Sequence, residues 1–202
     1  MCLSRLAEEL FPFPHYLARA RRQRRRSESP DILKEPGYAE YGSLPAEQLM
    51  ERLKEERARA VALDDKTFKL TLSLSVGLTV LGSTAAVLVR AVSAPTMQAT
   101  LTVIIGVALF YVLSAGFVAI GALRTLPSFG YGTAFLQQQQ AGAPNAIADA
   151  LARQEIMNSI RHLRNETAYQ AMRNGLVLLF AGVLLFAAAL AYQTLCPGLP
   201  PA

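Results

Sequence analysis

The sequence predicts an all-α integral membrane protein with three transmembrane helices, the first and third extended into the cytoplasm as a helical stalk. The chain is 52% apolar and only 17% charged, whereas average soluble proteins carry about 25% charged residues. Charged residues are absent from 70–89, 91–123 and 174–202. Each of these stretches is long enough to cross a bilayer core of about 30 Å. This pattern excludes a soluble globular enzyme.

Residues 1–43 are expected to form a basic, partly disordered cytoplasmic tail, with an irregular linker where Pro and Gly recur near its end. Its main feature is an arginine cluster: Arg19, Arg21, Arg22, Arg24, Arg25 and Arg26. Arginines close to a membrane gain about 1 kcal/mol each from anionic lipid headgroups, and apolar residues precede the cluster. We therefore assign the cluster to the lipid surface. A solvated tail and nucleic-acid binding are the less favoured alternatives.

Residues 44–69 predict the first stalk helix, because Pro45 suits a first helical turn and no Pro or Gly follows it there. A mostly apolar stripe follows alternating spacings of four and three, and Glu56 fills its missing position: Leu49, Leu53, Ala60, Leu63, Thr67 and Leu70. The helix continues into the first span, 70–89. A hydroxyl stripe there is expected to let helices pack closely, with a narrow wet pathway as the alternative: Thr71, Ser75, Thr79 and Ser83.

The other spans are predicted at 97–123 and 175–192. Between them we expect a cytoplasmic loop, 124–144, whose aromatic residues lie at the lipid headgroups, and a second stalk helix, 145–173. Residues 193–202 are expected to form an external tail. Small residues recur at spacings near seven in both spans, which favours close helix packing: Gly106, Ser114 and Gly121 in the second span, and Gly175, Gly182 and Ala189 in the third.

The Lys and Arg residues near the span ends predict the orientation of the chain in the membrane. Six lie within the twenty residues before the first span, only Arg90 lies in the turn after it, and none follows the third span. The N-terminus is therefore expected inside and the C-terminus outside. We expect the chain in the cytoplasmic (inner) membrane of a bacterium.

The two stalk helices are expected to run in the same direction and to pair side by side. Counting thirteen positions back from the last cation before each span sets Glu56 level with Ile160. Glu56 is thus predicted to pair with Arg161 or Arg164, because an unpaired carboxylate in an apolar seam is costly. The alternative is a solvated Glu56, since exposed ion pairs contribute only about 0–1 kcal/mol.

The sequence contains no recognisable catalytic cluster, and no cofactor is expected. His162 and Glu166 share a helix face at a spacing that suits two metal ligands, but a third ligand is missing, so no metal site is predicted. The spans lack ionisable residues, which argues against a coupled transporter. We expect a non-catalytic membrane adaptor or assembly subunit that acts through its cytoplasmic helices on a second copy or another membrane protein. An oligomeric pore or membrane-disrupting effector is the first alternative, and a membrane enzyme subunit the second.

Overall fold

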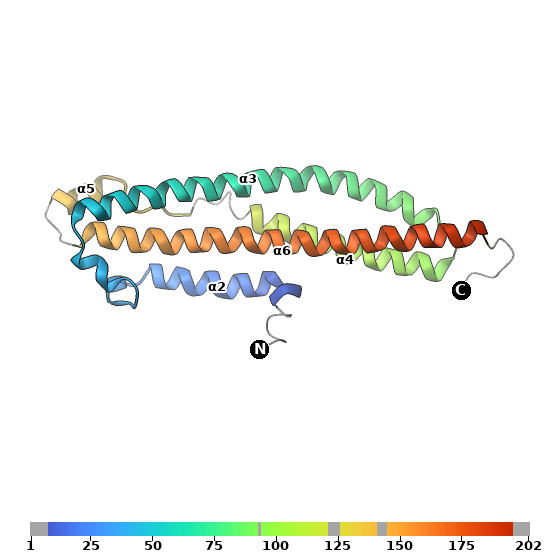
Figure 1. The fold of residues 1–202 in the computed structure, drawn as a ribbon, viewed down its shortest axis with the longest axis horizontal. Helices are drawn as coiled ribbons and strands as arrows, with labels where there is room; N and C mark the ends of the chain where they lie inside the picture. The colour runs from blue at the N-terminus through green and yellow to red at the C-terminus, as the bar shows by residue number, and fades with distance from the viewer. Residues whose placement is uncertain (1–7, 93, 121–125, 141–144, 196–202) are drawn as a thin grey trace. The chain divides into compact units, whose positions relative to one another are not determined.

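The computed structural model describes residues 8–92, 94–120, 126–140 and 145–195, without the side chains of 73, 75–77, 79–81, 83–86, 88 and 134. The predicted all-helical class is confirmed, since these residues form helices and no strand (Figure 1). The α-helices are α2 (Pro12–Ser27), α3 (Ala46–Arg90), α4 (Pro95–Ile120), α5 (Thr133–Gln140) and α6 (Ala146–Leu195). Two short 3₁₀ helices, η1 (Ile32–Lys34) and η2 (Ala39–Ser43), connect α2 to α3.

The chain folds into two compact units. The apolar unit consists of Met1–Phe13, Lys69–Ala119 and Thr167–Ala202, and the polar unit consists of Pro14–Phe68 and Ile120–Glu166. Helices α3 and α6 therefore each contribute residues to both units.

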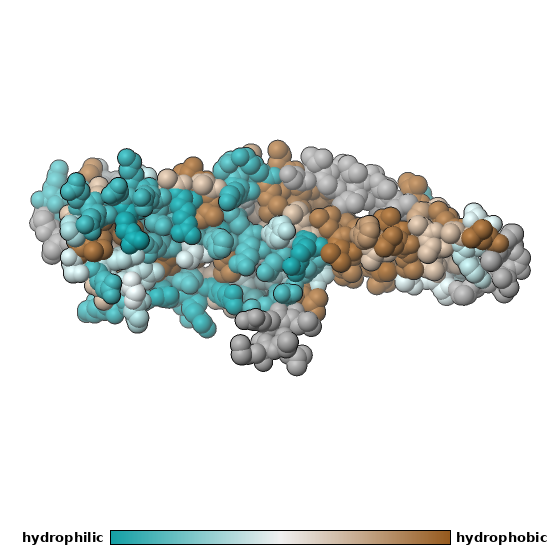
Figure 2. Space-filling model, viewed as in Figure 1, coloured by the Kyte–Doolittle hydropathy of each residue, from teal (hydrophilic) through white to brown (hydrophobic). Residues whose placement is uncertain are grey.

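Two helices, α4 and α6, are long and apolar enough to cross a membrane, judged by length and composition alone. Only 28% and 17% of their most apolar stretches are buried, so these residues mostly face outward. Figure 2 shows hydrophobic side chains gathered on the surface of the apolar unit, where Phe110, Phe117 and Phe180 are exposed. The first predicted span, 70–89, belongs to α3, and most of its side chains lie outside the described residues.

Within the apolar unit, α4 runs antiparallel to α6. Gly175 lies against Val112 and Ala108, and Gly182 lies against Ile104, so the contacts move toward the start of α4 as α6 advances. A Cβ added at Gly175 would lie 2.6 Å from Val112 Cγ2 and 3.0 Å from the Ala108 carbonyl oxygen. The nearest atom to a Cβ at Gly182 would be 3.4 Å away. Of these two glycines of α6, Gly175 therefore has the less room beside α4.

The other predicted packing residues have different surroundings. Ala189 is buried. Gly106 is exposed, and an added Cβ would meet no atom of the described residues within 4 Å. The Ser114 hydroxyl donates to the Phe110 carbonyl of its own helix over 2.8 Å. Gly121 and the side chains of Ser75, Thr79 and Ser83 lie outside the described residues.

The polar unit has its core between α3 and α6. Five members of the predicted stripe on α3 are buried and face this core: Leu49, Leu53, Ala60, Leu63 and Thr67. The sixth, Leu70, belongs to the apolar unit and is only partly buried. Leu49 and Leu53 cluster with Leu151 of α6 and Phe135 of α5. A second cluster joins η1 to the next turns of α6 through Ile32, Ile156 and Ile160.

Two segments of the polar unit differ from expectation. Part of the expected tail forms α2, which begins at a Pro that the first helical turn tolerates. Ala20 of α2 packs on the cluster around Ile32, whose side chain is fully buried. The loop expected at the lipid headgroups turns Phe129 and Phe135 into the same core. Their described residues supply apolar side chains to this core, and burial of apolar surface favours folding.

Candidate functional site

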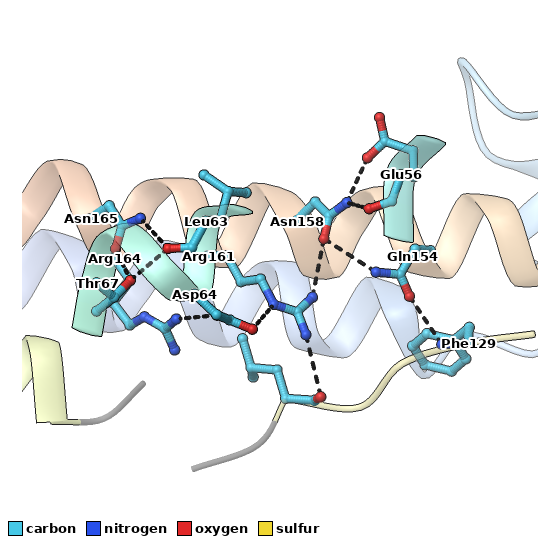
Figure 3. A network of polar contacts seen from close by, with 11 residues as sticks. Glu56, Leu63, Asp64, Thr67, Phe129, Gln154, Asn158, Arg161, Arg164 and Asn165 are labelled. Atoms are coloured by element: carbon cyan, nitrogen blue, oxygen red, sulfur yellow. Dashed lines mark hydrogen bonds and ion pairs between the residues drawn. The ribbon is translucent and has the colours of Figure 1, made fainter. Parts of the chain in front are cut away.

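A row of polar side chains on α6 is almost fully buried in the polar unit. Gln154, Asn158 and Arg161 lie four and three positions apart, which places them on one face of the helix. Arg164 follows one turn later, and these four residues are at most 2% exposed. Buried polar groups destabilise a fold unless they are hydrogen-bonded, so their partners define the candidate site (Figure 3).

Asp64 of α3 binds both buried arginines. Arg161 Nε donates to Asp64 Oδ2 over 3.1 Å, and Arg164 Nη2 donates to Asp64 Oδ1 over 2.8 Å (Figure 3). Arg161 also donates to Asn158 Oδ1 over 3.1 Å and to the Leu126 carbonyl over 3.4 Å. One carboxylate therefore bridges two arginines whose side chains are only 3% and 2% exposed.

Arg164 is the less satisfied of the two arginines. Burial lowers the pKa of its guanidinium, and Asp64 opposes that shift. Its Nε has no hydrogen-bond partner within the described part of the chain. Tyr16 of α2 shares this environment, because burial raises the pKa of its phenol while Arg164 lowers it. Arg164 thus depends on Asp64 for compensation of its charge.

The contacts between α3 and α6 continue beyond the arginines. Asn165 Nδ2 donates to the Leu63 carbonyl over 3.0 Å, and Asn165 Oδ1 accepts from the Thr67 hydroxyl. Thr67 is fully buried. The row on α6 therefore meets α3 over several consecutive turns of polar contacts.

The structure gives Glu56 partners other than the predicted arginines. Its carboxylate accepts from Asn158 Nδ2 over 2.6 Å and pairs with Arg59 at 3.2 Å. The reason is the register of the two helices. The hydrogen bonds between α3 and α6 join residues 97 to 102 positions apart in sequence, whereas placing Glu56 opposite Ile160 requires a separation of 104. The helices run in the same direction, shifted by about one turn from the predicted alignment.

The loop before α5 is held by side chains from both long helices. Gln154 Oε1 accepts from the Phe129 amide over 3.0 Å. Arg57 of α3 donates to the carbonyls of Phe129 (3.2 Å) and Gly130, and its guanidinium lies 3.8 Å from the centre of the Tyr131 ring. Gly130 has φ +77°, a backbone region that favours glycine, and an added Cβ would collide with Arg57. Arg57 was not predicted as a site residue, because its role depends on the fold of a loop.

A second polar contact joins η2 to α6. Tyr41 Oη donates to both carboxylate oxygens of Glu155, at 2.8 and 2.9 Å. Burial and then the hydrogen bond to Glu155 raise the pKa of Tyr41 to about 12. Burial also raises the pKa of the Glu155 carboxyl, although the Tyr41 hydrogen bond opposes this.

Tyr41→Phe should therefore lower the stability of the polar unit near neutral pH by about 1 kcal/mol, because a half-buried carboxylate loses a donor. Folded Tyr41 keeps its proton to a higher pH than unfolded tyrosine, because its pKa rises from a usual value of 10.0 to about 12. Its stabilisation is present below pH 10 and is lost as the pH rises through about 12. Chemical unfolding of the wild-type chain and of Tyr41→Phe across this pH range should show that the variant loses less unfolding free energy at alkaline pH. Equal alkaline losses would contradict the contact, and Tyr131→Phe, at an exposed ring, is the control.

The predicted lipid arginines all lie on α2. Arg153 of α6 fixes the end of this helix, since it donates to the Ser27 carbonyl and, over 2.9 Å, to the Ser29 carbonyl. Arg26 pairs with Glu35 at 2.7 Å. The other members of the cluster are exposed: Arg19, Arg21, Arg22, Arg24 and Arg25.

The described polar groups form a structural network. Arg161, Arg164, Asn158 and Gln154 use donors and acceptors on one another, on α3 and on the loop before α5. Among the described residues, no three His, Cys, Asp or Glu side chains lie together as a metal site would require. Fold and site define an all-helical protein with two candidate membrane spans and a polar unit in which buried arginines of α6 bind Asp64 of α3. Comparisons with protein-family models, curated proteins and solved structures give no match.

Proposed function

We propose that the chain is a membrane adaptor or assembly subunit without catalytic activity of its own, which acts through its polar unit. The observation that supports this most is the buried network of Asp64, Arg161 and Arg164. Buried ion pairs are poor sources of stability compared with apolar packing, and their best-attested use is to fix a register. A fixed register presents the outer face of α3 in one defined geometry, which a binding partner requires.

In this proposal the chain crosses the membrane three times, with the polar unit and the N-terminus in the cytoplasm and the C-terminus outside. The outward-facing apolar surfaces of α4 and α6 support insertion, and the Lys and Arg bias supports the orientation. The membrane is the cytoplasmic membrane of a bacterium. The partner is a second copy or another membrane protein.

The two native cysteines test the orientation, because Cys2 and Cys196 lie at opposite ends of the chain. A maleimide that cannot cross membranes, added to intact cells, should label the Cys2→Ser variant through Cys196. It should spare the Cys196→Ser variant until the cells are permeabilised. The reverse pattern would invert the proposed topology.

Site-specific photocrosslinking tests the adaptor role. Val61 is 71% exposed on the polar part of α3, so a photoreactive residue there should capture a protein partner in living cells. The same residue at Val177, exposed at 62% on the apolar part of α6, should react with lipid instead. Crosslinking at position 61 should disappear in the Asp64→Ala variant, because α3 is then no longer held in a fixed alignment with α6. The chain should stay in the membrane.

The pore alternative makes a different prediction. It is favoured by the hydroxyl stripe of Ser75, Thr79 and Ser83, which could line a narrow wet pathway in an oligomer. The purified chain in planar bilayers should show no discrete conductance if it is an adaptor. Reproducible single-channel steps that change in a Thr79→Val variant would overturn the adaptor proposal in favour of the pore.

A further inference from the structure

The arginine cluster on α2 borders a groove within the polar unit. The groove has a volume of about 540 Å³ and is lined chiefly by Arg21, Arg22, Arg25, Arg26, Ser29 and Glu35. Arg19 and Arg24 do not line it. The cluster is thus divided by the fold into four arginines that share one concave surface and two that point elsewhere.

The charges of the groove are not balanced within the described part of the chain. Glu35 is the acidic lining residue, and it is occupied by Arg26, whose Nε and Nη2 both lie 2.7 Å from Glu35 Oε2. Arg21, Arg22 and Arg25 have no ion-pair partner among the described residues. Four cations and one carboxylate leave a net charge of +3, and guanidinium groups suit phosphate oxygens because they donate in pairs.

The residues that precede α2 are hydrogen-bonded within the apolar unit, close to a predicted span. Asn174, which directly precedes the third span, donates to the Glu9 carbonyl over 2.6 Å, and Tyr111 of α4 donates to the Leu10 carbonyl over 2.7 Å. Leu10 and Phe11 are 45% and 63% exposed beside these contacts. Exposed apolar residues next to a span end suit the membrane interface, and Arg21 follows Leu10 eleven positions later in the chain.

We propose that this groove binds the headgroup of an anionic phospholipid that carries two phosphates. The inference rests on the membrane insertion proposed above. Two phosphates match the excess of positive charge better than one, and the groove is larger than a single phosphate requires. The Ser29 hydroxyl supplies a further hydrogen-bonding group at the rim of the groove.

The test uses the full-length chain in mild detergent, titrated with cardiolipin or with twice the amount of phosphatidylglycerol, with bound lipid counted by native mass spectrometry. One cardiolipin should be retained more tightly than phosphatidylglycerol at equal total charge. Arg21→Gln/Arg25→Gln should weaken cardiolipin binding by about 10- to 30-fold, because two guanidinium groups no longer attract the headgroup. Arg19→Gln/Arg24→Gln removes the same charge from the same helix outside the groove and should change binding by less than about threefold.

Equal losses in the two double variants would overturn the proposal, because net charge alone would then explain binding. Free pyrophosphate or single-stranded DNA that binds as tightly as cardiolipin, with the same dependence on Arg21 and Arg25, would also overturn it by replacing the lipid with a soluble ligand. Carbonate extraction of cell membranes separates the two proposals. Release of the chain by carbonate would contradict the proposed membrane insertion. If the chain is retained but both double variants lose cardiolipin binding equally, only the proposed lipid groove is contradicted.

Discussion

Asp64→Ala should destabilise the polar unit by about 3 kcal/mol, since removing one partner of a buried ion pair strands the other charge. Asp64 compensates two arginines whose side chains are only 3% and 2% exposed, while its own side chain is 44% exposed. The expected loss therefore lies at the low end of the range for buried pairs. Hydrogen exchange of backbone amides in 56–67 and 154–166 should accelerate by roughly a hundredfold.

Glu55→Ala is the matched control, because Glu55 is an exposed acid on the same helix. Its effect should stay within about 0.5 kcal/mol. The triple variant Asp64→Leu/Arg161→Met/Arg164→Met replaces the ion network with apolar side chains and should recover most of the lost stability. Unchanged exchange in Asp64→Ala would show that the arginines are not desolvated against α3.

Gly175→Leu should give the second large effect, this time in the apolar unit. A Cβ at this position already lies 2.6 Å from Val112 Cγ2 and 3.0 Å from a backbone oxygen that has little room to move. Overpacking of this kind costs about 1–3 kcal/mol, and the leucine side chain places the variant at the upper end of that range. The midpoint temperature of thermal unfolding in detergent should fall, while the fraction of the chain inserted in membranes stays the same.

The glycines of the same unit provide a graded control. Gly182→Leu should have a smaller effect, since its neighbours lie 3.4 and 3.9 Å from an added Cβ. Gly106→Leu should have almost none, because an added Cβ there meets no atom of the described residues within 4 Å. Similar losses at all three positions would show that the substitutions act on insertion or helix propensity. The tight packing of Gly175 against α4 would then be contradicted.

The all-helical class could be predicted because periodicity and composition are local properties of the chain. The stripe that includes Leu49, Leu53 and Leu63 identified the buried face of α3, and the charge gaps identified α4 and the end of α6 as candidate spans. These inferences need only the spacing of residues along one helix.

Contacts between elements were harder to predict, because they depend on register and on how loops close. The alignment of α3 and α6 was set from charges near the span ends, which locate a helix only to within a turn, so Asp64 was missed as the partner of Arg161 and Arg164. Helix α2 was missed because its arginine run resembles a solvated tail, although Phe13, Tyr16 and Ala20 recur at helical spacing. No local signal indicates that Arg57 binds the loop before α5.

Oxidative crosslinking between α3 and α6 tests the central claim, that a fixed register holds the two helices together in the polar unit. In a background with both native cysteines replaced by serine, Glu56→Cys/Asn158→Cys places thiols at two positions that contact each other in the structure. Glu56→Cys/Ile160→Cys places them at the alternative alignment, where Ile160 instead packs in the cluster around Ile32. Rapid intramolecular disulfide formation in the first variant but not the second is predicted, and the opposite order of rates would contradict the account.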